Sequence, residues 1–247
     1  MITVHSWGVA GGLVDGGRLG QMWLGKSRGG AVDLDSLTLG NRLVGNDKSA
    51  PAYESSGGLA LQFGESTAVS VTGAVADLSV SDGPPVGWGS VAVLPAGCTL
   101  RVGRVLDGAR VYIAVRSVDA VGQPISESVP RSAPATTVGV WLGPRHDWFA
   151  DSAWATLCSS AYVVADTSRV GARLSGSVLE RVRSGDLPSE GLVEGAVQVP
   201  PDGQPIVMLA DHPTTGGYPV IGVVDPADIR HVAQAAVGTE LRFHATH

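Results

Sequence analysis

The chain has 247 residues, of which 44% are hydrophobic and 16% are charged, and its formal net charge is −6 at pH 7. These proportions are typical of a folded globular protein and exclude an intrinsically disordered chain. The acidic net charge, without a basic run anywhere in the sequence, argues against a nucleic-acid-binding surface.

One helix and several short strands are predicted in the first half of the chain, where glycines punctuate apolar runs. The helix is predicted at 32–44, because apolar residues recur there at helical spacing and Gly45 follows as a stop signal. Asp33 precedes the apolar pattern and is expected to cap the helix. The predicted strands are 59–63, 67–72, 78–80, 91–94, 99–102 and 110–115.

The second half is separated from the first by residues 118–137, a stretch rich in Ser, Pro and Ala. We expect this linker to divide the chain into two β-rich subdomains, 1–125 and 126–247. The strands predicted in the second half are 138–142, 161–166, 193–199, 206–209 and 240–243.

Two further features of the second half have a clear local mechanism. Pro200-Pro201-Asp202-Gly203 is a turn, since Pro presets φ, Asp bonds its own backbone and Gly tolerates positive φ. A helix is predicted from Pro226 to a stop at Gly238, with Asp225 as its N-cap. Many short strands joined by Gly and Pro turns predict a mainly β protein with a few helices, built as a barrel or a sandwich.

Residues 20–27 match the phosphate-binding pattern G-x-x-x-x-G-K-[ST] letter for letter. That pattern binds phosphate only between a buried strand and a helix, whose N-terminal amides face the ligand. Residues 11–18 before it are instead rich in Gly and charge, and Arg28-Gly29-Gly30 after it would break a helix. We interpret the match as coincidental, while Lys26 stays open as a contact for an anion.

A polar cluster follows the predicted strand at 206–209. His212 is a candidate base there, and Asp211 is a candidate to orient it or to bind a cation. Adjacent residues of a strand face opposite ways, so the two serve one ligand only if the strand has already ended. The alternative is that Asp211 caps the turn at 214–217.

Two arginines, Arg169 and Arg173, flank Gly171 beyond the predicted strand at 161–166. A guanidinium matches a carboxylate or a phosphate with two parallel N–H donors, so both are candidates to bind an anionic substrate. The alternative is a surface ion pair. Gln198 is equally suited to a substrate contact and to a structural hydrogen bond. The candidate substrate or nucleotide contacts are Gln198, Thr214, Thr215, Gly216, Gly217 and Tyr218.

Cys98 and Cys158 are too few for a disulfide framework, and neither the cysteines nor the histidines have the spacing of metal ligands. The sequence therefore predicts no metal site. Residues 1–17 lack the basic and apolar regions of a signal peptide, and no apolar run is long enough to span a bilayer. We expect a cytoplasmic protein that contacts no membrane.

An ordered series of short segments, spread over nearly the whole chain, carries a family resemblance. The segments are Gly30-Ala31-Val32-Asp33, 41–46, Thr72-Gly73-Ala74, 143–149, 168–174 and 189–221. With these motifs the chain resembles the family of the 5-oxoprolinase C subunit, also called biotin-dependent carboxyltransferase-like or allophanate hydrolase subunit 2. The resemblance implies cyclophilin-like β-barrel subdomains with a few flanking helices. The Gly-Ser-x-Ser-Thr loop of the family is not recognisable at 117–128.

The resemblance implies a subunit of an ATP-dependent enzyme that opens the lactam of 5-oxoproline to glutamate. The chain would act in a complex with a B subunit and an A subunit, and would be inactive or incomplete alone; the complex would use ATP. Arg169 and Arg173 would stabilise oxyanion or phosphate charge, and His212 would transfer protons. The loop at 214–217 would bind the substrate carboxylate.

Two other functions stay open on the same resemblance. One is biotin-dependent carboxyl transfer, or allophanate-hydrolase-type chemistry, on a urea or amide nitrogen. The sequence has no Met-Lys-Met context for biotin attachment, so we expect no covalent biotin on this chain. The other function is non-catalytic, that of a regulatory partner that antagonises an inhibitor of a sporulation kinase.

Overall fold

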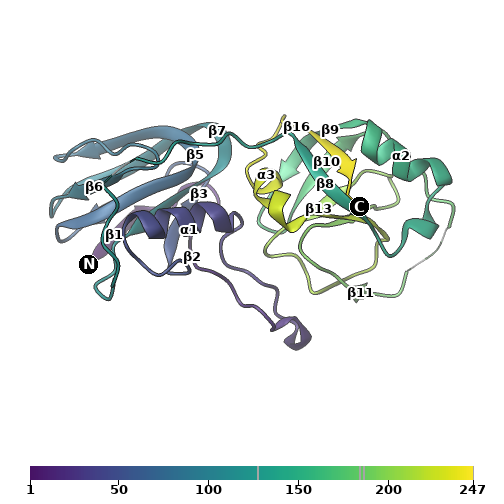
Figure 1. The fold of residues 1–247 in the computed structure, drawn as a ribbon, viewed down its shortest axis with the longest axis horizontal. Coiled ribbons are helices and arrows are strands. Elements are labelled where there is room, and N and C mark those ends of the chain that lie inside the picture. Colours follow the sequence, from purple (N-terminus) through teal and green to yellow (C-terminus); the bar gives the residue numbers. More distant parts are fainter. Residues whose placement is uncertain (127, 184, 186, 247) are drawn as a thin grey trace. The chain divides into compact units, whose positions relative to one another are not determined.

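The computed structural model describes residues 1–126, 128–183, 185 and 187–246. Contacts between residues divide the chain into two compact units (Figure 1). Unit 1 comprises Met1–Gly17 and Asp33–Ala133, and unit 2 comprises Arg18–Val32 and Pro134–His247. The stretch Arg18–Val32 therefore belongs to unit 2, although the chain on both sides of it belongs to unit 1. The predicted domain boundary at 125/126 stays a prediction.

Unit 1 is a curled antiparallel sheet with one helix packed on it. Its strands run in the order β1-β4-β7-β3-β2, and β5 pairs with β7 and β6. The strands are β1 Ile2–Ser6, β2 Gly12–Val14, β3 Ala52–Ser55, β4 Ala60–Phe63, β5 Thr67–Ser81, β6 Val91–Leu94 and β7 Thr99–Val115.

The helix of unit 1, α1 (Leu34–Leu43), begins and ends close to the predicted positions. Oδ1 of Asp33 accepts a hydrogen bond from the backbone N–H of Ser36 at 3.0 Å, so the predicted N-cap is confirmed. Leu37 and Leu43 are fully buried, and the helix contacts β5 and β7. The Thr72 hydroxyl on β5 donates to the carbonyl of Ser36 at 2.7 Å, which ties the first turn of the helix to the sheet.

The two longest strands differ from the prediction. β5 has 15 residues and β7 has 17, whereas two short strands were predicted in place of each, which is wrong. The two strands pair with one another along most of their length, with register shifts between Gly73 and Leu78. Bulges of this kind break the apolar–polar alternation without ending the pairing, so the local pattern suggested a gap.

Unit 2 is a closed barrel with strand order β10-β13-β12-β15-β8-β16-β9. Neighbouring strands are antiparallel except β8 and β16, which are parallel. Tyr162 and Phe243 fill the interior edge to face, with ring centroids 6.0 Å apart. The barrel strands are β8 Thr137–Leu142, β9 Ala161–Thr167, β10 Gly171–Gly176, β12 Ala196–Gln198, β13 Ile206–Met208, β15 Val220–Val224 and β16 Glu240–Ala245.

Smaller elements of unit 2 surround the barrel. They are the paired strands β11 Glu190–Gly191 and β14 Thr215–Gly216, the helices α2 Asp151–Ser159 and α3 Ile229–Ala233, and the 3-10 turns η1 Met22–Leu24, η2 His146–Trp148 and η3 Pro226–Asp228. The predicted fold class, mainly β with a few helices and with a β-barrel, is confirmed. Among the described residues, no helix combines the length and the hydrophobicity that crossing a bilayer requires.

The β12–β13 hairpin forms as predicted, with the Gly203 N–H donating to the Pro200 carbonyl at 3.0 Å across the turn. The C-terminal helix is much shorter than predicted. Oδ1 of Asp225 caps the 3-10 turn η3, which leads into α3, and α3 ends at Ala233 rather than near Gly238. The Gly238 N–H donates to the Val164 carbonyl at 2.9 Å, so the chain has already turned onto β9.

Candidate functional site

An ion pair joins two of the predicted site residues, Arg169 and Asp211. Arg169 lies in the turn between β9 and β10, and Asp211 follows β13; Gly171 of β10 pairs with Met208 of β13, so the two side chains meet at one end of the barrel. Nε and Nη2 of Arg169 donate to Oδ2 and Oδ1 of Asp211 at 2.7 and 3.2 Å. This two-pronged contact fixes the plane of the guanidinium. It is an ion pair of the kind that the sequence left open as the alternative role of Arg169.

A loop with two glycines lies against this ion pair. The Gly30 carbonyl accepts from Nη2 of Arg169 at 2.6 Å, and both Gly29 and Gly30 have positive φ angles, +60° and +68°. Glycine adopts this backbone conformation without steric cost. A Cβ atom on Gly29 would lie 2.7 Å from Nη2 of Arg18 and 3.8 Å from Oδ1 of Asp211. The absent side chain therefore makes room for the Arg18 guanidinium beside Asp211.

Arg18 differs in its contacts from Arg28, the other arginine of this loop. Its side chain is exposed, and within the described residues its guanidinium has no hydrogen bond or ion pair. Its backbone N–H donates to the Arg28 carbonyl at 2.6 Å, which closes the loop at its base. The two-pronged donor set of Arg18 is thus available to an anion.

Arg28 belongs to the same loop and is buried, with 8% of its surface exposed. Its Nε and Nη2 donate to Glu194 at 2.8 and 2.7 Å, and Nη2 also donates to the Ala31 carbonyl at 3.0 Å. Nη1 is buried, with no partner in the described part of the chain. A buried charged donor without an acceptor is energetically costly.

We call Arg18, Arg28 and Arg169, with Asp211 and Glu194, the arginine cluster. These five side chains carry three positive and two negative charges, an excess that suits an anionic oxygen. All of them belong to unit 2. Arg169 and Asp211 were predicted as site residues from the sequence, whereas Arg18 and Arg28 were missed. The available signal was a pair of arginines that frame a glycine-rich loop.

His212, the predicted base, follows Asp211 in the sequence. Its side chain is buried, with 1% of its surface exposed. Its Nδ1 lies 2.7 Å from the Pro213 carbonyl. Because a carbonyl only accepts, Nδ1 carries the proton and Nε2 is left as the acceptor nitrogen. β13 ends at Met208, so Asp211 and His212 both lie beyond the strand and the alternation of strand side chains does not apply to them.

The 214–218 loop is held by its backbone. Gln198 is buried, and its Nε2 donates to the Tyr218 carbonyl at 2.9 Å, which is the structural role that the sequence left open. Thr215 and Gly216 pair with β11, and the Thr214 carbonyl accepts from the backbone N–H of Leu192 at 3.0 Å. The side chains of Thr215 and Tyr218 are exposed. Whether Thr214, Thr215, Gly216, Gly217 and Tyr218 contact a substrate stays a prediction.

An ion pair between Arg145 and Glu190 supports β11. Nε of Arg145 donates to Oε2 of Glu190 at 2.9 Å, and Nη2 donates to Oε1. This hydrogen bonding holds the pKa of the Glu190 carboxyl below its ordinary value. β11 in turn pairs with the 215–216 strand, so this contact anchors the loop that follows His212.

Arg173 lies on β10 with Ile206 and Asp166 as its strand neighbours, and its side chain is exposed. Asp211 forms its ion pair with Arg169, not with Arg173. A role for Arg173 in substrate binding stays a prediction.

The phosphate-loop pattern at 20–27 has no phosphate-loop structure. The only regular element inside it is the 3-10 turn η1, which ends at Gly25 in the left-handed conformation. No helix begins between Lys26 and Leu34, a fully described stretch, so the match is coincidental as interpreted.

Other chemistries find little support in the described residues. They contain no group of three or more His, Cys, Asp or Glu side chains that could hold a metal ion. Burial raises the pKa of the thiols of Cys98 and Cys158, which disfavours the thiolate.

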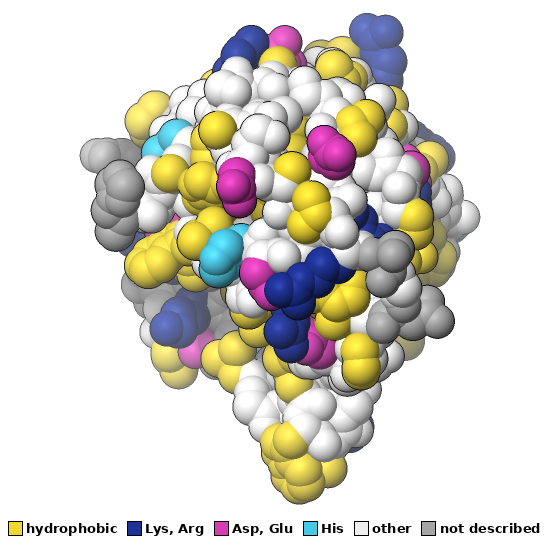
Figure 2. All heavy atoms as spheres, turned by 90° about the vertical axis from the view of Figure 1, so that its right-hand side faces the viewer, with side chains coloured by type: hydrophobic (Ala, Val, Ile, Leu, Met, Phe, Trp, Pro, Cys, Tyr) yellow, Lys and Arg dark blue, Asp and Glu magenta, His cyan; other side chains and the backbone are white. Residues whose placement is uncertain are grey.

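Figure 2 shows one face of the molecule, on which acidic and basic side chains lie side by side among hydrophobic ones.

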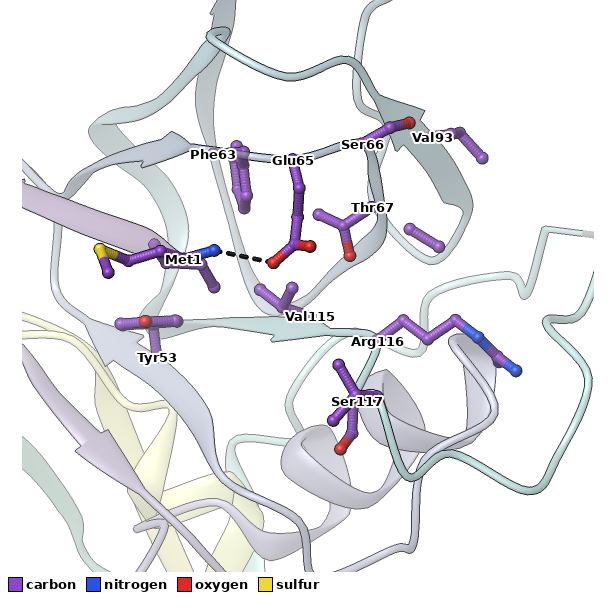
Figure 3. A pocket seen from close by; sticks show the side chains of 13 residues that line it. Met1, Tyr53, Phe63, Glu65, Ser66, Thr67, Val93, Val115, Arg116 and Ser117 are labelled. Carbon is purple, nitrogen blue, oxygen red and sulfur yellow. Dashed lines mark hydrogen bonds and ion pairs between the residues drawn. The ribbon is translucent and has the colours of Figure 1, made fainter.

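Unit 1 carries a separate groove of about 600 Å³ (Figure 3). The N-terminal ammonium of Met1 and the carboxylate of Glu65 meet across it at 2.7 Å, while Arg116 points away and donates to the Val44 carbonyl. The hydrogen bond from the ammonium group holds the pKa of the Glu65 carboxyl below its ordinary value. None of the predicted site residues lines this groove.

Residues 24–125 and 117–245 match the family described as "Carboxyltransferase domain, subdomain A and B". The chain belongs to this family. Within the carboxyltransferase domain family, it is 32% identical to the C subunit of 5-oxoprolinase from Escherichia coli (strain K12), over 98% of this chain and 90% of that protein. The family resemblance stated from the sequence motifs is thereby confirmed.

Two longer proteins are similar to this chain over most or all of its length. The urea amidolyase of Saccharomyces cerevisiae is 25% identical over 92% of this chain, which spans 16% of that protein. The solved structure of TTHA0988 has a TM-score of 0.84 and 31% identity over 100% of this chain. The chain spans about half of the length of that solved relative, 56%.

Proposed function

We propose that the chain is the C subunit of an ATP-dependent 5-oxoprolinase, which opens the lactam of 5-oxoproline to glutamate in a complex with a B subunit and an A subunit. The proposal rests on the likeness to the C subunit of the Escherichia coli 5-oxoprolinase. The observation that carries it is the exposed Arg18 guanidinium beside the Arg169–Asp211 ion pair. A cytoplasmic location without membrane or nucleic-acid contact is part of the proposal.

The proposed substrate has two groups that the arginine cluster suits. Its carboxylate would pair with Arg18, whose donors have no partner in the described chain. Charge that develops on the lactam oxygen would be stabilised by Arg169, which Asp211 holds in place before the reaction begins. A preorganised donor of this kind needs no reorientation at the transition state.

The proposed proton transfer belongs to His212. Its Nδ1–H is engaged by the Pro213 carbonyl, so Nε2 is the nitrogen that would accept and return the proton. A lactam is a stable amide, and ATP would activate its carbonyl oxygen as a phosphate ester. In this proposal Arg173 is a second cation, and Thr214, Thr215, Gly216 and Gly217 offer amides and hydroxyls to the substrate.

The test is reconstitution of the three subunits with ATP and 5-oxoproline, followed by measurement of glutamate release. We expect His212→Ala to lower kcat about 100-fold or more, the range of general acid–base catalysis. Arg169→Ala should lower kcat about 100-fold, as for the loss of one oxyanion donor. Arg18→Ala should mainly raise KM, because the carboxylate is bound equally in the ground state and the transition state.

Arg242→Ala is the matched control. Arg242 also forms an ion pair, with Glu240 at 2.8 Å, but about half of its side chain is exposed, and neither residue belongs to the arginine cluster. The complex with Arg242→Ala should release glutamate at the rate of the wild type. Full glutamate release by both Arg169→Ala and His212→Ala would exclude the site assignment, and an inactive wild-type complex would count against the function itself.

A second candidate function is carboxyl transfer from biotin to a urea or amide nitrogen. The likeness to a urea amidolyase over 92% of the chain favours it. In this case biotin would be carried by another protein. Incubation with a carboxybiotinyl partner and urea, with the carboxylated product as the readout, distinguishes it from lactam opening. The regulatory function stays a prediction; tight association of the B subunit with a chain inactive in both assays would favour it.

A further inference from the structure

A pocket of about 530 Å³ in unit 2 has no role in the proposed reaction. One of its walls is built by residues between 146 and 154, which overlap the segment 143–149 that carries the family resemblance and which the arginine cluster does not use. The pocket lies beside α2, whose residues Asp151 and Trp154 line it. Its volume lies within the range of about 300–1,000 Å³ for small-molecule sites.

The pocket and the arginine cluster lie at different positions around the barrel. Leu142 of β8 and Ile221 of β15 line it, whereas Arg169 precedes β10. In the closed strand order, β15 and β8 are each three strands away from β10, in opposite directions. The two sites share no residue, so each is testable without the other.

The lining is mostly apolar and partly aromatic. Phe149 and Ile221 are buried at its base, and Leu142 and Val182 are exposed at its rim. Trp154 of α2 packs on the barrel so closely that a Cβ on Gly222 would lie 3.2 Å from its ring. An apolar body would bury these side chains, and the π-face of a tryptophan attracts a cation.

The polar side chains of the pocket accept hydrogen bonds. Nδ1 of His146 lies 3.0 Å from the Gly143 carbonyl, so Nδ1 carries the proton and Nε2 is left to accept. Oδ2 of Asp147 pairs with Arg183 at 2.8 Å, which leaves Oδ1 as an acceptor. The Asp151 carboxylate, in the first turn of α2, has no hydrogen bond or ion pair within the described residues. A ligand that matches these groups donates several hydrogen bonds and carries positive charge.

We propose that this pocket binds a primary ammonium ion carried on a small apolar body. The ammonium donates to Asp151 and to the remaining acceptors of Asp147 and His146, and the body packs on Trp154 and Phe149. A neutral alcohol of the same shape loses the charge-assisted hydrogen bonds, and a carboxylate is repelled by Asp151. The proposal requires neither partner subunits nor the lactam reaction.

The experiment titrates the whole chain with 2-phenylethylammonium, 2-phenylethanol and phenylacetate, and measures affinity by calorimetry and by NMR shifts of the indole N–H groups. We expect the ammonium to bind about tenfold more tightly than the alcohol, and phenylacetate to bind more weakly than both. Asp151→Asn should lower the affinity for the ammonium about tenfold and leave the affinity for the alcohol unchanged.

Asp166→Asn is the matched control, since Asp166 is an exposed aspartate on β9 outside the pocket and its replacement changes the net charge equally. It should bind the ammonium as the wild type does. Trp154→Phe, which keeps an aromatic face, should bind more tightly than Trp154→Leu. Equal affinities for ammonium and alcohol, equal losses in Asp151→Asn and Asp166→Asn, or no binding at all would each overturn the proposal.

Discussion

Two buried side chains, Arg28 and Tyr162, carry polar atoms without a partner among the described residues. Arg28 places a guanidinium inside unit 2, and Glu194 accepts two of its donors while Nη1 is left without a partner among the described residues. In the barrel interior the hydroxyl of Tyr162 is also buried without a partner among the described residues, but it is uncharged. Burial also raises the pKa of Tyr162 to about 12.

Tyr162→Phe tests whether the barrel interior gains anything from this hydroxyl. Removal of an unpaired hydroxyl of unchanged ring shape should leave the free energy of unfolding at pH 7 equal or raise it by about 1 kcal/mol. The folded pKa is raised, so the tyrosine ionises first in the unfolded chain, and stability is lost as pH rises from about 10 towards 12.

The variant should therefore lose less stability than the wild type between pH 10 and 12, measured by urea unfolding at several pH values. Tyr218→Phe is the control, because Tyr218 is 45% exposed. A Tyr162→Phe variant that is clearly less stable at pH 7 would mean that the hydroxyl has a partner.

At this scale the sequence led to some site residues and not to others. Asp33 and Asp211 were found because a cap and a strand-end carboxylate have local signatures. Arg18 and Arg28 were not selected, because Asp211, beside which Arg18 lies, and Glu194, which pairs with Arg28, are far along the chain. The role of Gln198 was left open for the same reason, since its acceptor is a backbone carbonyl 20 residues away.

Elements of secondary structure follow the local pattern where one face is buried and the pairing is regular. The helix α1 and the strands β4 and β6 lie close to their predicted positions. The pattern failed at β5 and β7, where bulges interrupt the alternation, and at the C-terminal helix, where a hydrogen bond to β9 diverts the chain. In each case a contact distant in sequence prevailed over the local preference.

Asp33→Ala tests the cap at the start of α1. Both carboxylate oxygens of Asp33 accept from Ser36, at 3.0 Å from the backbone N–H and 2.6 Å from the hydroxyl. Loss of an N-cap should lower the free energy of unfolding by about 1 kcal/mol, measured by urea denaturation. Asp33→Asn keeps an accepting oxygen and should be close to the wild type. Equal losses in the two variants would point to the charge rather than to the cap.

The whole molecule is organised by a chain that enters unit 2 twice. Arg18–Val32 contributes Val32 to the barrel core and donates from Gly29 to the Ala210 carbonyl at 3.0 Å. The boundary predicted at 125/126 stays a prediction, and the structure adds that Arg18–Val32 belongs to unit 2. The sequence suggested two β-rich halves. Composition alone gives no sign that the short segment Arg18–Val32 packs in unit 2.

A fragment of residues 126–247 should therefore be less stable than unit 2 in the whole chain. It lacks Val32 in the core and leaves Glu194 without Arg28. A synthetic peptide of residues 18–32, added in trans, should raise the unfolding temperature of the fragment, measured by calorimetry. A peptide with Arg28 and Val32 replaced by alanine should have a smaller effect. A fragment that unfolds at the same temperature with and without the native peptide would contradict this view.

The same excursion has a consequence for how the protein forms. Arg28 and Glu194 are 166 residues apart in sequence, and Gly30 and Arg169 are 139 apart. Contacts of such long range close large loops and slow folding. During synthesis, Arg18–Val32 leaves the ribosome long before its partners exist. The earliest part of unit 2 to be made thus finds its place only after its partners at 194–211 have been translated, and the arginine cluster is completed only then.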